Sequence, residues 1–373
     1  MKKRVLITAG GTGGHIYPAV ALASQLQKKI PEIELLFVGG KLSTNRYFQG
    51  QPYNHHEVSC GKWSSKNPLK LLKSLIQIVR GVWQSRRIIK KYQPDLIVGF
   101  GSYHTFPTLF AAKLSKKPII LHEANSIPGK VNRLLSRHVA VTGVHFPETA
   151  AMLHGPAVEV GLPLREQFTL SSATKQEART YFGLDSQAIV ILVFGGSQGA
   201  KAINTILSEA LTKHFPKSSE SIQILHFSGD PEQTKYLEQL YAAAGIKAYV
   251  KEHEQKMNLA WIAADMVIAR AGASTIAEQM EFEVPGILIP FPQAADNHQG
   301  INADFMVRVG GAIKFIQADL TSEKLAQMIK NFLKSDCAQL KEMRKAIQLY
   351  GKRSKRIDLC SLVCELLEAE DRS

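Results

Sequence analysis

The sequence predicts an α/β protein of two domains, each with a parallel β-sheet covered by helices on both faces. The chain has 373 residues, roughly two to three times the commonest domain size. Strand-like apolar runs alternate with helical patterns, and a strand, a glycine-rich loop and a helix follow one another near the start of each half. Hydrophobic residues make up 45% and charged residues 21%, which is ordinary for a globular enzyme and excludes a disordered or fibrous chain.

The first half opens with an apolar run at residues 5–8, a glycine-rich stretch at 10–14 and a helical pattern at 18–26. Further strands are predicted at 34–38, 96–98 and 119–122, with helical stretches between them. This alternation is typical of a parallel sheet with crossover helices.

The second half begins in the same way, with an apolar strand at 188–194, a glycine-rich loop at 195–200 and a helix at 201–211. Later strands are predicted at 222–227, 248–250, 266–269 and 286–290. Two such openings predict two Rossmann-like domains that face each other across a cleft. We expect an N-terminal domain at 1–162, a C-terminal domain at 163–340 and a final helical segment at 341–373, for which a return to the first domain is one option.

Charge is spread unevenly along the chain. Residues 1–162 contain 22 Lys and Arg against 7 Asp and Glu, whereas residues 163–373 contain 24 against 25. The first half therefore carries the whole positive excess, which indicates an anionic partner for that half. No RNA-binding or DNA-reading motif is present, so an anionic membrane surface is favoured over nucleic acid.

Residues 61–92 contain nine basic residues and no acidic one. Apolar residues recur there at helical spacing: Leu69, Leu72, Leu75, Ile76, Val79, Val82 and Trp83. One interpretation is a basic amphipathic helix that lies at the lipid headgroups. The other is a crossover helix whose apolar stripe packs on a sheet, and different turns of one helix can satisfy both.

Cysteine usage and apolar runs point to a metal-free protein in a reducing compartment. The four cysteines, Cys60, Cys337, Cys360 and Cys364, have no partners at metal-ligand spacing. The chain shows no apolar run long enough to span a bilayer and no cleavable signal at its start.

The glycine loops suit phosphate binding, because glycine lets the backbone approach a ligand and the helix that follows offers N–H groups. Neither loop has the phosphate-loop pattern of nucleotide hydrolases. The first also lacks the last glycine of the dinucleotide fingerprint, where Ile16 stands, and no acidic residue ends the second strand. A tight turn that binds nothing is the alternative for either loop taken alone.

A third segment, residues 257–278, reads as a helix, a short strand, a turn of small residues and a second helix. Ser274 and Thr275 in its first turn can cap that helix or bond a diphosphate. Glu278, one turn later, can accept both hydroxyls of a ribose or lie on a solvated face. Polar residues at 293–302 follow the next strand, at the edge where parallel sheets bind ligands.

Five motifs occur in order, from about residue 4 to about residue 310. They are Gly10-Gly-Thr-Gly-Gly-His15, His122-Glu-Ala-Asn125, Gly195-Gly-Ser-Gln-Gly-Ala200, Arg270-Ala-Gly-Ala-Ser-Thr275 with Glu278, and Asp296-Asn-His-Gln299 with Asn302. Together they resemble the family of UDP-N-acetylglucosamine:undecaprenyl-pyrophosphoryl-MurNAc-pentapeptide N-acetylglucosaminyltransferases. Each motif alone is weak, but the set at this spacing is specific.

The resemblance implies the GT-B fold and an inverting transfer of GlcNAc from UDP-GlcNAc to the 4-hydroxyl of lipid I, giving lipid II. It implies no metal and no cofactor, and a role in peptidoglycan synthesis, cell shape and cell division. The implied location is peripheral, at the anionic cytoplasmic face of the bacterial inner membrane. The alternatives are another UDP-sugar-dependent GT-B enzyme with a different lipid acceptor, and a UDP-GlcNAc epimerase.

The resemblance also assigns residues to roles. Those implied to bind UDP-GlcNAc are Thr12, Gly13, Gly14, Asn125, Arg165, Ser197, Ser274, Thr275, Glu278 and Gln299. Those implied to meet the acceptor pyrophosphate are Gly13, Gly14, Gly101, Ser102 and Tyr103. His15 is implied as the general base, since an imidazole exchanges protons near neutral pH, with a phosphate ligand as its other interpretation.

Three positions depart from the pattern of the family. Ser102 stands where a glycine is expected, Ala124 replaces a glutamine, and Leu162 replaces an asparagine. None of them removes a residue to which a chemical role is assigned.

Overall fold

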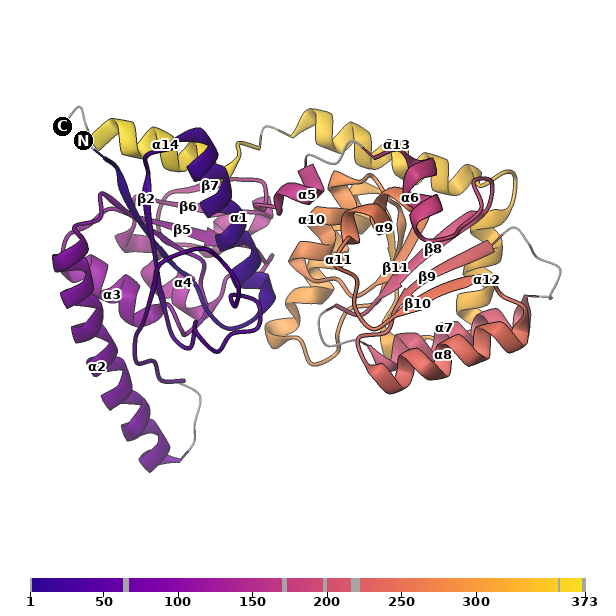
Figure 1. The fold of residues 1–373 in the computed structure, drawn as a ribbon, viewed down its shortest axis with the longest axis horizontal. Helices are drawn as coiled ribbons and strands as arrows, with labels where there is room; N and C mark the ends of the chain where they lie inside the picture. The colour runs from indigo at the N-terminus through magenta and orange to yellow at the C-terminus, as the bar shows by residue number, and fades with distance from the viewer. Residues whose placement is uncertain are drawn as a thin grey trace. The chain divides into compact units, whose positions relative to one another are not determined.

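The computed structural model describes residues 2–62, 67–169, 173–196, 200–215, 222–354 and 356–370. The chain divides into two compact units (Figure 1): unit 1 is residues 1–166 with 355–373, and unit 2 is residues 167–354. Each unit contains one parallel sheet, which confirms the predicted α/β fold with two parallel-sheet domains.

The sheet of unit 1 has the strand order β3-β2-β1-β4-β5-β6-β7. Its strands are β1 (Arg4–Thr8), β2 (Glu34–Gly39), β3 (His55–Glu57), β4 (Leu96–Gly99), β5 (Ile119–Glu123), β6 (Val141–Val144) and β7 (Ala157–Glu159). Strand β1 pairs in parallel with β2 on one side and β4 on the other, so Val5 lies opposite both Leu35 and Leu96. The order therefore reverses between β1 and β4, and parallel sheets bind ligands at the carboxyl ends of strands at such a point.

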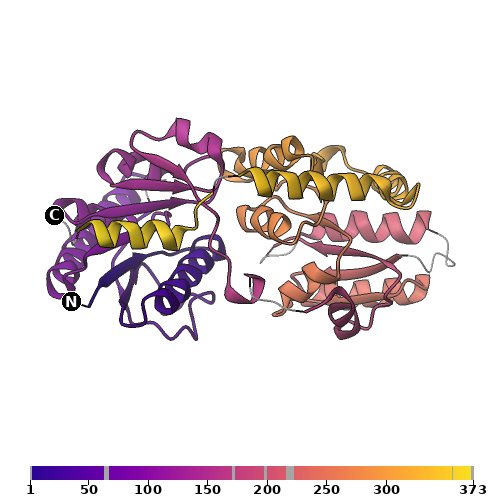
Figure 2. The ribbon, with the colours of Figure 1, turned by 90° about the horizontal axis from the view of Figure 1, so that it is seen from above.

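Helices cover both faces of this sheet. They are α1 (Gly13–Lys29), α2 (Pro68–Tyr92), α3 (Phe106–Leu114), α4 (Lys130–Leu135) and α14 (Leu359–Glu370). On one face α1 and α14 share a core through Leu22 and Val363, and Figure 2 shows the two helices side by side. On the other face α2 and α3 contribute Ile89 and Leu109. Burial on both faces explains why β1 and β4 are continuously apolar rather than alternating.

The C-terminal segment is attached to unit 1 just before α14. Val160 and Ile357 form a parallel β-bridge. The half-buried Glu159 accepts a hydrogen bond from Nε of Arg356 over 2.5 Å. Helix α14 therefore extends the core of unit 1 although it follows the whole of unit 2 in the chain.

The sheet of unit 2 has the order β10-β9-β8-β11-β12-β13, which reverses between β8 and β11. Its strands are β8 (Ile189–Phe194), β9 (Ile222–Phe227), β10 (Ala248–Lys251), β11 (Met266–Ala269), β12 (Gly286–Leu288) and β13 (Ala312–Lys314). Its helices are α6 (Lys175–Tyr181), α7 (Lys201–His214), α8 (Pro231–Ala244), α9 (Met257–Ala263), α10 (Ala273–Glu281), α11 (His298–Val309), α12 (Ser322–Leu333) and α13 (Ala338–Arg353), and the short α5 (Glu166–Thr169) leads in from unit 1. Both units thus place a glycine-rich loop at the point where strand order reverses.

Local sequence signals set the ends of several helices. Helix α8 begins after Asp230, whose carboxylate accepts a hydrogen bond from the N–H of Gln233 over 2.8 Å, and Pro231 takes the first helical position. It ends at Gly245, which has a φ of +71°. Helix α6 begins with a capping box between Thr174 and Glu177.

Candidate functional site

The first glycine loop joins β1 to α1. The carbonyl of Thr12 accepts hydrogen bonds from the N–H groups of His15 and Ile16, so Thr12 begins the helix through its backbone. Its side chain makes no cap bond, and Oγ1 instead lies 3.3 Å from Nδ1 of His15. A Cβ on Gly13 would lie 3.0 Å from the ring of Tyr17, which explains the glycine there. The loop therefore places His15 in the first turn of α1.

The second loop of unit 1 joins β4 to α3. Gly101 and Ser102 both have left-handed backbone, with φ of +76° and +72°. Tyr103 is 36% exposed, and its ring lies 4.0 Å from that of His104. A Cβ on Gly11 would lie 3.1 Å from Oγ of Ser102, so the two loops are in contact. The loop that carries Gly13 and Gly14 thus lies next to the loop that carries Gly101, Ser102 and Tyr103.

Asn125 follows β5, and the buried Glu123 fixes its backbone. The carboxylate of Glu123 accepts hydrogen bonds from the N–H groups of Asn125 and Gly129 over 3.0 and 2.8 Å, and from Nδ2 of Asn132 over 2.9 Å. Burial raises the pKa of Glu123, and these hydrogen bonds oppose the rise. Sequence reasoning assigned no role to Glu123. The sequence feature that could have identified Glu123 is an acidic residue at the end of an apolar strand.

His122, which precedes Glu123 in β5, is also buried. Burial, and to a smaller extent the charge of His15, lowers the pKa of His122 to about 3. His122 is therefore neutral at physiological pH.

The sequence also did not predict the contact between Cys60 and His104. Sγ of Cys60 lies 3.3 Å from Nδ1 of His104. Burial raises the pKa of the Cys60 thiol and lowers that of His104, so both groups are neutral near pH 7. A Cβ on Gly40 would overlap both side chains. The two residues are 44 positions apart in the chain, and only the fold makes them neighbours.

Arg165 belongs to unit 1, where its guanidinium lies over the ring of Tyr17 at 4.8 Å from the centroid. The ring of Tyr17 in turn meets that of Tyr47 edge-on, at 5.5 Å between centroids. Next to Tyr47, Nδ2 of Asn45 donates to the carbonyl of Gly11 over 2.7 Å. Arg165 thus joins the group of side chains around the first glycine loop.

In unit 2, α10 begins where β11 ends. Ser274 and Thr275 lie in its first turn after the N-cap residue Gly272, as the sequence predicts. The preceding carbonyl, of Ala271, accepts a hydrogen bond from Nδ2 of Asn302 over 3.0 Å. Glu278 lies one turn further along. Ser197, which sequence also assigned to the donor, lies outside the described residues.

Gln299 and Arg270 lie at the same edge of the sheet. Oε1 of Gln299, in the first turn of α11, accepts a hydrogen bond from the N–H of Phe291 over 2.9 Å. The buried Arg270 donates from Nη1 to the carbonyls of Ile289 and Pro290, and from Nη2 to Oε1 of Gln317. These partners are all neutral, and burial lowers the pKa of Arg270 without removing its charge. Arg270 belongs to one of the five sequence motifs, but the sequence alone predicted no role for its side chain.

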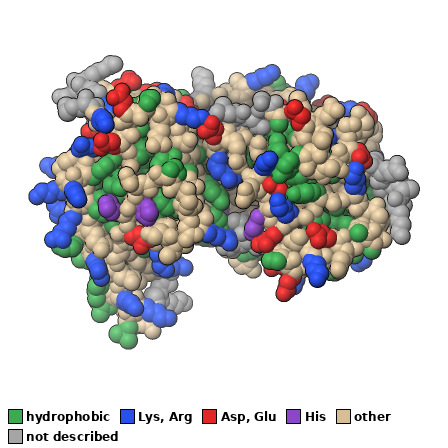
Figure 3. Space-filling model, viewed as in Figure 1, with side chains coloured by type: hydrophobic (Ala, Val, Ile, Leu, Met, Phe, Trp, Pro, Cys, Tyr) green, Lys and Arg blue, Asp and Glu red, His purple; other side chains and the backbone are tan. Residues whose placement is uncertain are grey.

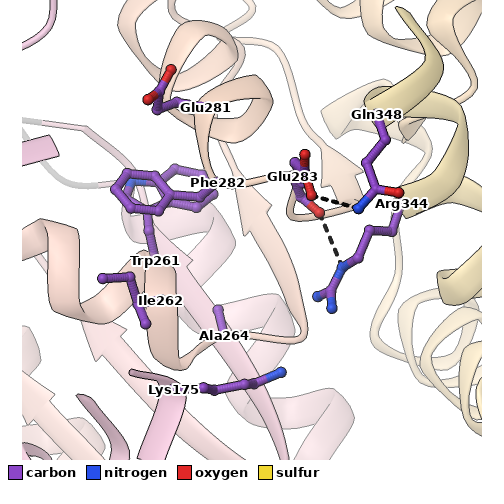
Figure 4. A pocket seen from close by; sticks show the side chains of 9 residues that line it. All are labelled: Lys175, Trp261, Ile262, Ala264, Glu281, Phe282, Glu283, Arg344 and Gln348. Atoms are coloured by element: carbon purple, nitrogen blue, oxygen red, sulfur yellow. Dashed lines mark hydrogen bonds between the residues drawn. The ribbon is translucent and has the colours of Figure 1, made fainter. Parts of the chain in front are cut away.

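A cavity of about 380 Å³ lies elsewhere in unit 2 (Figure 4). Lys175, Trp261, Glu281 and Arg344 are among its lining residues. None of the described residues that line it is predicted to bind the donor, although its lining residue Trp261 donates a hydrogen bond to Glu278.

Helix α2 divides into two parts. In its first part Leu69, Leu72, Ile76 and Val79 are 76%, 56%, 60% and 62% exposed. In its second part Gly81, Ser85 and Ile89 are buried, with Oγ of Ser85 3.2 Å from Oγ1 of Thr108 on α3. Figure 3 shows hydrophobic and basic side chains together over the protruding end of α2. The crossover interpretation thus holds for the second part, and the first part leaves an apolar face uncovered.

Neither a metal cluster nor a membrane-spanning helix is found among the residues that the structure describes. No group of three His, Cys, Asp or Glu side chains is placed to hold a metal ion there. No helix in the described ranges combines the length and the apolar character needed to cross a bilayer.

Comparison with known proteins gives matches along almost the whole chain. Family models match at residues 5–143, for the glycosyltransferase family 28 N-terminal domain, and at residues 190–358, for the C-terminal domain of that family. A "UDP-N-acetylglucosamine--N-acetylmuramyl-(pentapeptide) pyrophosphoryl-undecaprenol N-acetylglucosamine transferase" from Protochlamydia amoebophila (strain UWE25) is 50% identical, over 99% of this chain and 97% of its own. A protein of the same name from Chlamydia pneumoniae is 33% identical, over 98% and 100%.

The crystal structure of MurG from Acinetobacter baumannii superposes with a TM-score of 0.78 and is 28% identical, over 98% of this chain and 99% of its own. A UDP-N-acetylglucosamine 2-epimerase, 13% identical over 96% and 99%, has a TM-score of 0.61 and shares the fold alone. With both family models matched in order and 50% identity to a full-length relative, the chain belongs to glycosyltransferase family 28, among the UDP-N-acetylglucosamine--N-acetylmuramyl-(pentapeptide) pyrophosphoryl-undecaprenol N-acetylglucosamine transferases.

Proposed function

We propose that this chain is an inverting glycosyltransferase that moves GlcNAc from UDP-GlcNAc to the 4-hydroxyl of N-acetylmuramyl-(pentapeptide) pyrophosphoryl-undecaprenol in peptidoglycan synthesis. The observation that supports this most strongly is the 50% identity over 99% of the chain to a relative with that activity in its name. The two glycine loops, one at the strand reversal of each sheet, agree with two substrates that each carry a diphosphate.

We assign the uridine diphosphate to unit 2. The first turn of α10 offers N–H groups, the positive end of the helix dipole and the hydroxyls of Ser274 and Thr275. Arg270, whose partners are neutral, adds a positive charge two residues before Gly272. Charge that gathers on the leaving diphosphate is stabilised by such preorganised groups. Glu278 would accept the ribose hydroxyls, and Gln299 would bind the sugar.

We assign the acceptor to unit 1. Its pyrophosphate would bind at Gly13 and Gly14 and at the loop Gly101–Tyr103, two loops that are neighbours at Gly11 and Ser102. Donor contacts from this unit are proposed for Thr12, Gly13, Gly14, Asn125 and Arg165. The excess of basic residues in the first half favours a doubly anionic acceptor.

His15 is proposed as the general base. The reaction needs a group that takes the proton of the 4-hydroxyl as its oxygen attacks the anomeric carbon, on the face opposite UDP. A hydrogen bond from Nδ1–H of His15 to Oγ1 of Thr12 would place the basic lone pair on Nε2. His122 is neutral and buried, so it adds no charge that would oppose protonation of His15.

We infer that the first part of α2 binds an anionic membrane at the cytoplasmic face, where the lipid-linked acceptor is present. Its exposed Leu69, Leu72 and Ile76 would enter the headgroup layer while neighbouring Lys and Arg side chains meet lipid phosphates. In the second part of α2, Cζ of Arg87 lies 3.5 Å from the centroid of the Trp83 ring, and this amphipathic pair would suit the same interface.

The deciding experiment measures UDP release from UDP-GlcNAc with and without a synthetic lipid I analogue, in the presence of a chelator. The proposal expects turnover only when both substrates are present, unaffected by the chelator, with a β-linked disaccharide as product. Consumption of UDP-GlcNAc without any acceptor would instead identify an epimerase. Equal turnover with diacylglycerol would identify a transferase for another lipid.

A further inference from the structure

The side chain of Trp261, on α9, is completely buried, and its Nε1–H donates a hydrogen bond to Oε2 of Glu278 over 2.8 Å. We propose that Trp261 is a positioning residue for the donor, because this hydrogen bond holds the Glu278 carboxylate in the orientation that receives the ribose. The inference rests on the proposed role of Glu278 and adds a second residue, seventeen positions away in the chain, to nucleotide recognition.

The chemistry of the two groups makes the bond directional. An indole nitrogen only donates, and an ionised carboxylate only accepts, so neither partner can reverse its role. A glutamate side chain has three rotatable bonds, and fixing them on ligand binding costs conformational entropy. A carboxylate oriented in advance by Trp261 has already lost that freedom. Each carboxylate oxygen accepts more than one hydrogen bond, so Glu278 keeps acceptor capacity for two ribose hydroxyls.

Two aromatic contacts hold the indole in place. The ring of Phe282 lies parallel to it, with an interplanar angle of 2° and 6.2 Å between centroids, and Figure 4 shows this stacking. The ring of Phe194 meets it edge-on, at 84° and 5.6 Å. Rotation of the indole would break both contacts, so the direction of its N–H is set by the core.

The position of Phe194 ties this arrangement to the second glycine loop. Phe194 is the last residue of β8 and immediately precedes Gly195 and Gly196. Trp261 therefore contacts both the strand that carries this loop and the carboxylate proposed for the ribose. One buried side chain sets the position of Glu278 relative to β8.

The test compares four proteins: the wild type, Trp261→Phe, Glu278→Ala and the double variant. Phenylalanine keeps an aromatic ring in the core but lacks the N–H donor. The dissociation constant for UDP is measured by calorimetry, because it requires no turnover, and KM and kcat are measured with UDP-GlcNAc. We expect Trp261→Phe to weaken UDP binding about tenfold and raise KM similarly, with kcat within twofold of the wild type. In the Glu278→Ala background, Trp261→Phe is expected to change UDP binding by less than twofold.

A ribose probe separates positioning from packing. With 2′-deoxy-UDP the wild type is expected to bind more weakly, and Trp261→Phe is expected to add a smaller loss than it does with UDP, because only the 3′-hydroxyl then remains to bond Glu278. Equal losses for UDP and 2′-deoxy-UDP, or an undiminished effect in the Glu278→Ala background, would show that Trp261 only packs and would overturn the inference. If Trp261→Phe fails to fold, Trp261→His, which retains a ring N–H, replaces it, and binding close to that of the wild type is then expected.

The outcomes also separate this inference from the proposed function. If Glu278→Ala leaves UDP binding unchanged, the assignment of Glu278 to the ribose is wrong. If Glu278→Ala weakens binding but Trp261→Phe does not, only the positioning role fails. If UDP binds as expected but no GlcNAc reaches lipid I, the transferase activity fails and the positioning role stands.

Discussion

Nδ1 of His15 lies 3.3 Å from Oγ1 of Thr12, the residue that begins α1. Thr12 makes no cap bond through its side chain, so its hydroxyl is available to orient the imidazole instead. Because Thr12 is the N-cap residue of α1 and His15 lies in the first turn, their spacing is set by backbone geometry rather than by distant packing. In the tautomer whose Nδ1–H donates to this hydroxyl, the basic nitrogen is Nε2.

His15→Ala is expected to lower kcat about 10²- to 10⁴-fold, the usual contribution of a general base. Binding of UDP-GlcNAc, measured by calorimetry, should stay within about threefold of the wild type, because the proposed base acts on the acceptor. Thr12→Val, which keeps the shape of the side chain and removes its oxygen, should give a smaller loss in kcat. Turnover of His15→Ala at the wild-type rate would remove His15 as the base.

Glu278→Gln is expected to weaken UDP binding about 10- to 100-fold, because hydrogen bonds to a charged carboxylate are stronger than those to an amide. Glu281→Gln provides the matched control, since Glu281 ends the same helix and has no proposed role in donor binding. Titration calorimetry measures the dissociation constant for UDP in both variants. A loss of equal size in Glu281→Gln would point to a general disturbance of α10.

Replacing Lys70, Lys73 and Arg80 by Gln is expected to weaken binding to anionic vesicles about 100-fold, at about 1 kcal/mol for each basic residue. Sedimentation with vesicles rich in phosphatidylglycerol measures this, and the difference should shrink as added salt screens the charges. Lys235→Gln, on exposed α8 of unit 2, is the control and should leave binding unchanged. Equal sedimentation of the triple variant and the wild type would contradict a role for α2.

Ser102→Gly is expected to raise the free energy of unfolding by up to about 1 kcal/mol, because Ser102 has a φ of +72°, where a side chain is strained and glycine is not. Thermal unfolding followed by circular dichroism measures the change. Ser115→Gly, at a residue with a φ of −92°, should instead destabilise or have no effect. A lower melting temperature for Ser102→Gly would mean that contacts of its hydroxyl outweigh the backbone strain.

Acid is expected to destabilise unit 2 through His226. This buried side chain lies 2.9 Å from the hydroxyl of Tyr241 and 3.1 Å from Oδ1 of Asn204, and burial lowers its pKa to about 3. The unfolded chain therefore binds a proton near pH 6.5 that the folded chain binds only near pH 3, so stability falls as pH falls between these values. For this one group the loss between pH 6.5 and 5 is about 1.5 kcal/mol.

Urea unfolding of His226→Gln over the same pH range should show a shallower pH dependence than that of the wild type. An identical slope in the wild type and in His226→Gln would show that other groups govern acid stability.

Much of the site follows from local sequence. A strand, a glycine turn and a helix start are short-range features, so residues 10–15 and 270–278 predict two helix N-termini that the structure confirms at α1 and α10. Helical spacing places Ser274, Thr275 and Glu278 on one side of α10. The amphipathic pattern of α2 was equally clear. It did not determine whether the apolar face is buried or exposed, because exposure depends on which other segments cover that face.

Long-range contacts decided the rest. Arg270 acquires neutral partners from the segment that follows β12 and from Gln317. Cys60 meets His104 from a different loop, and Trp261 reaches Glu278 from another helix. No periodicity in the chain encodes these pairs. By itself the sequence determined the elements, the glycine turns and the residues that follow each strand, because these depend on neighbours within one or two turns. Only the tertiary structure decided which buried side chains hold those residues in place, because strand order and helix packing bring distant segments into hydrogen-bond range.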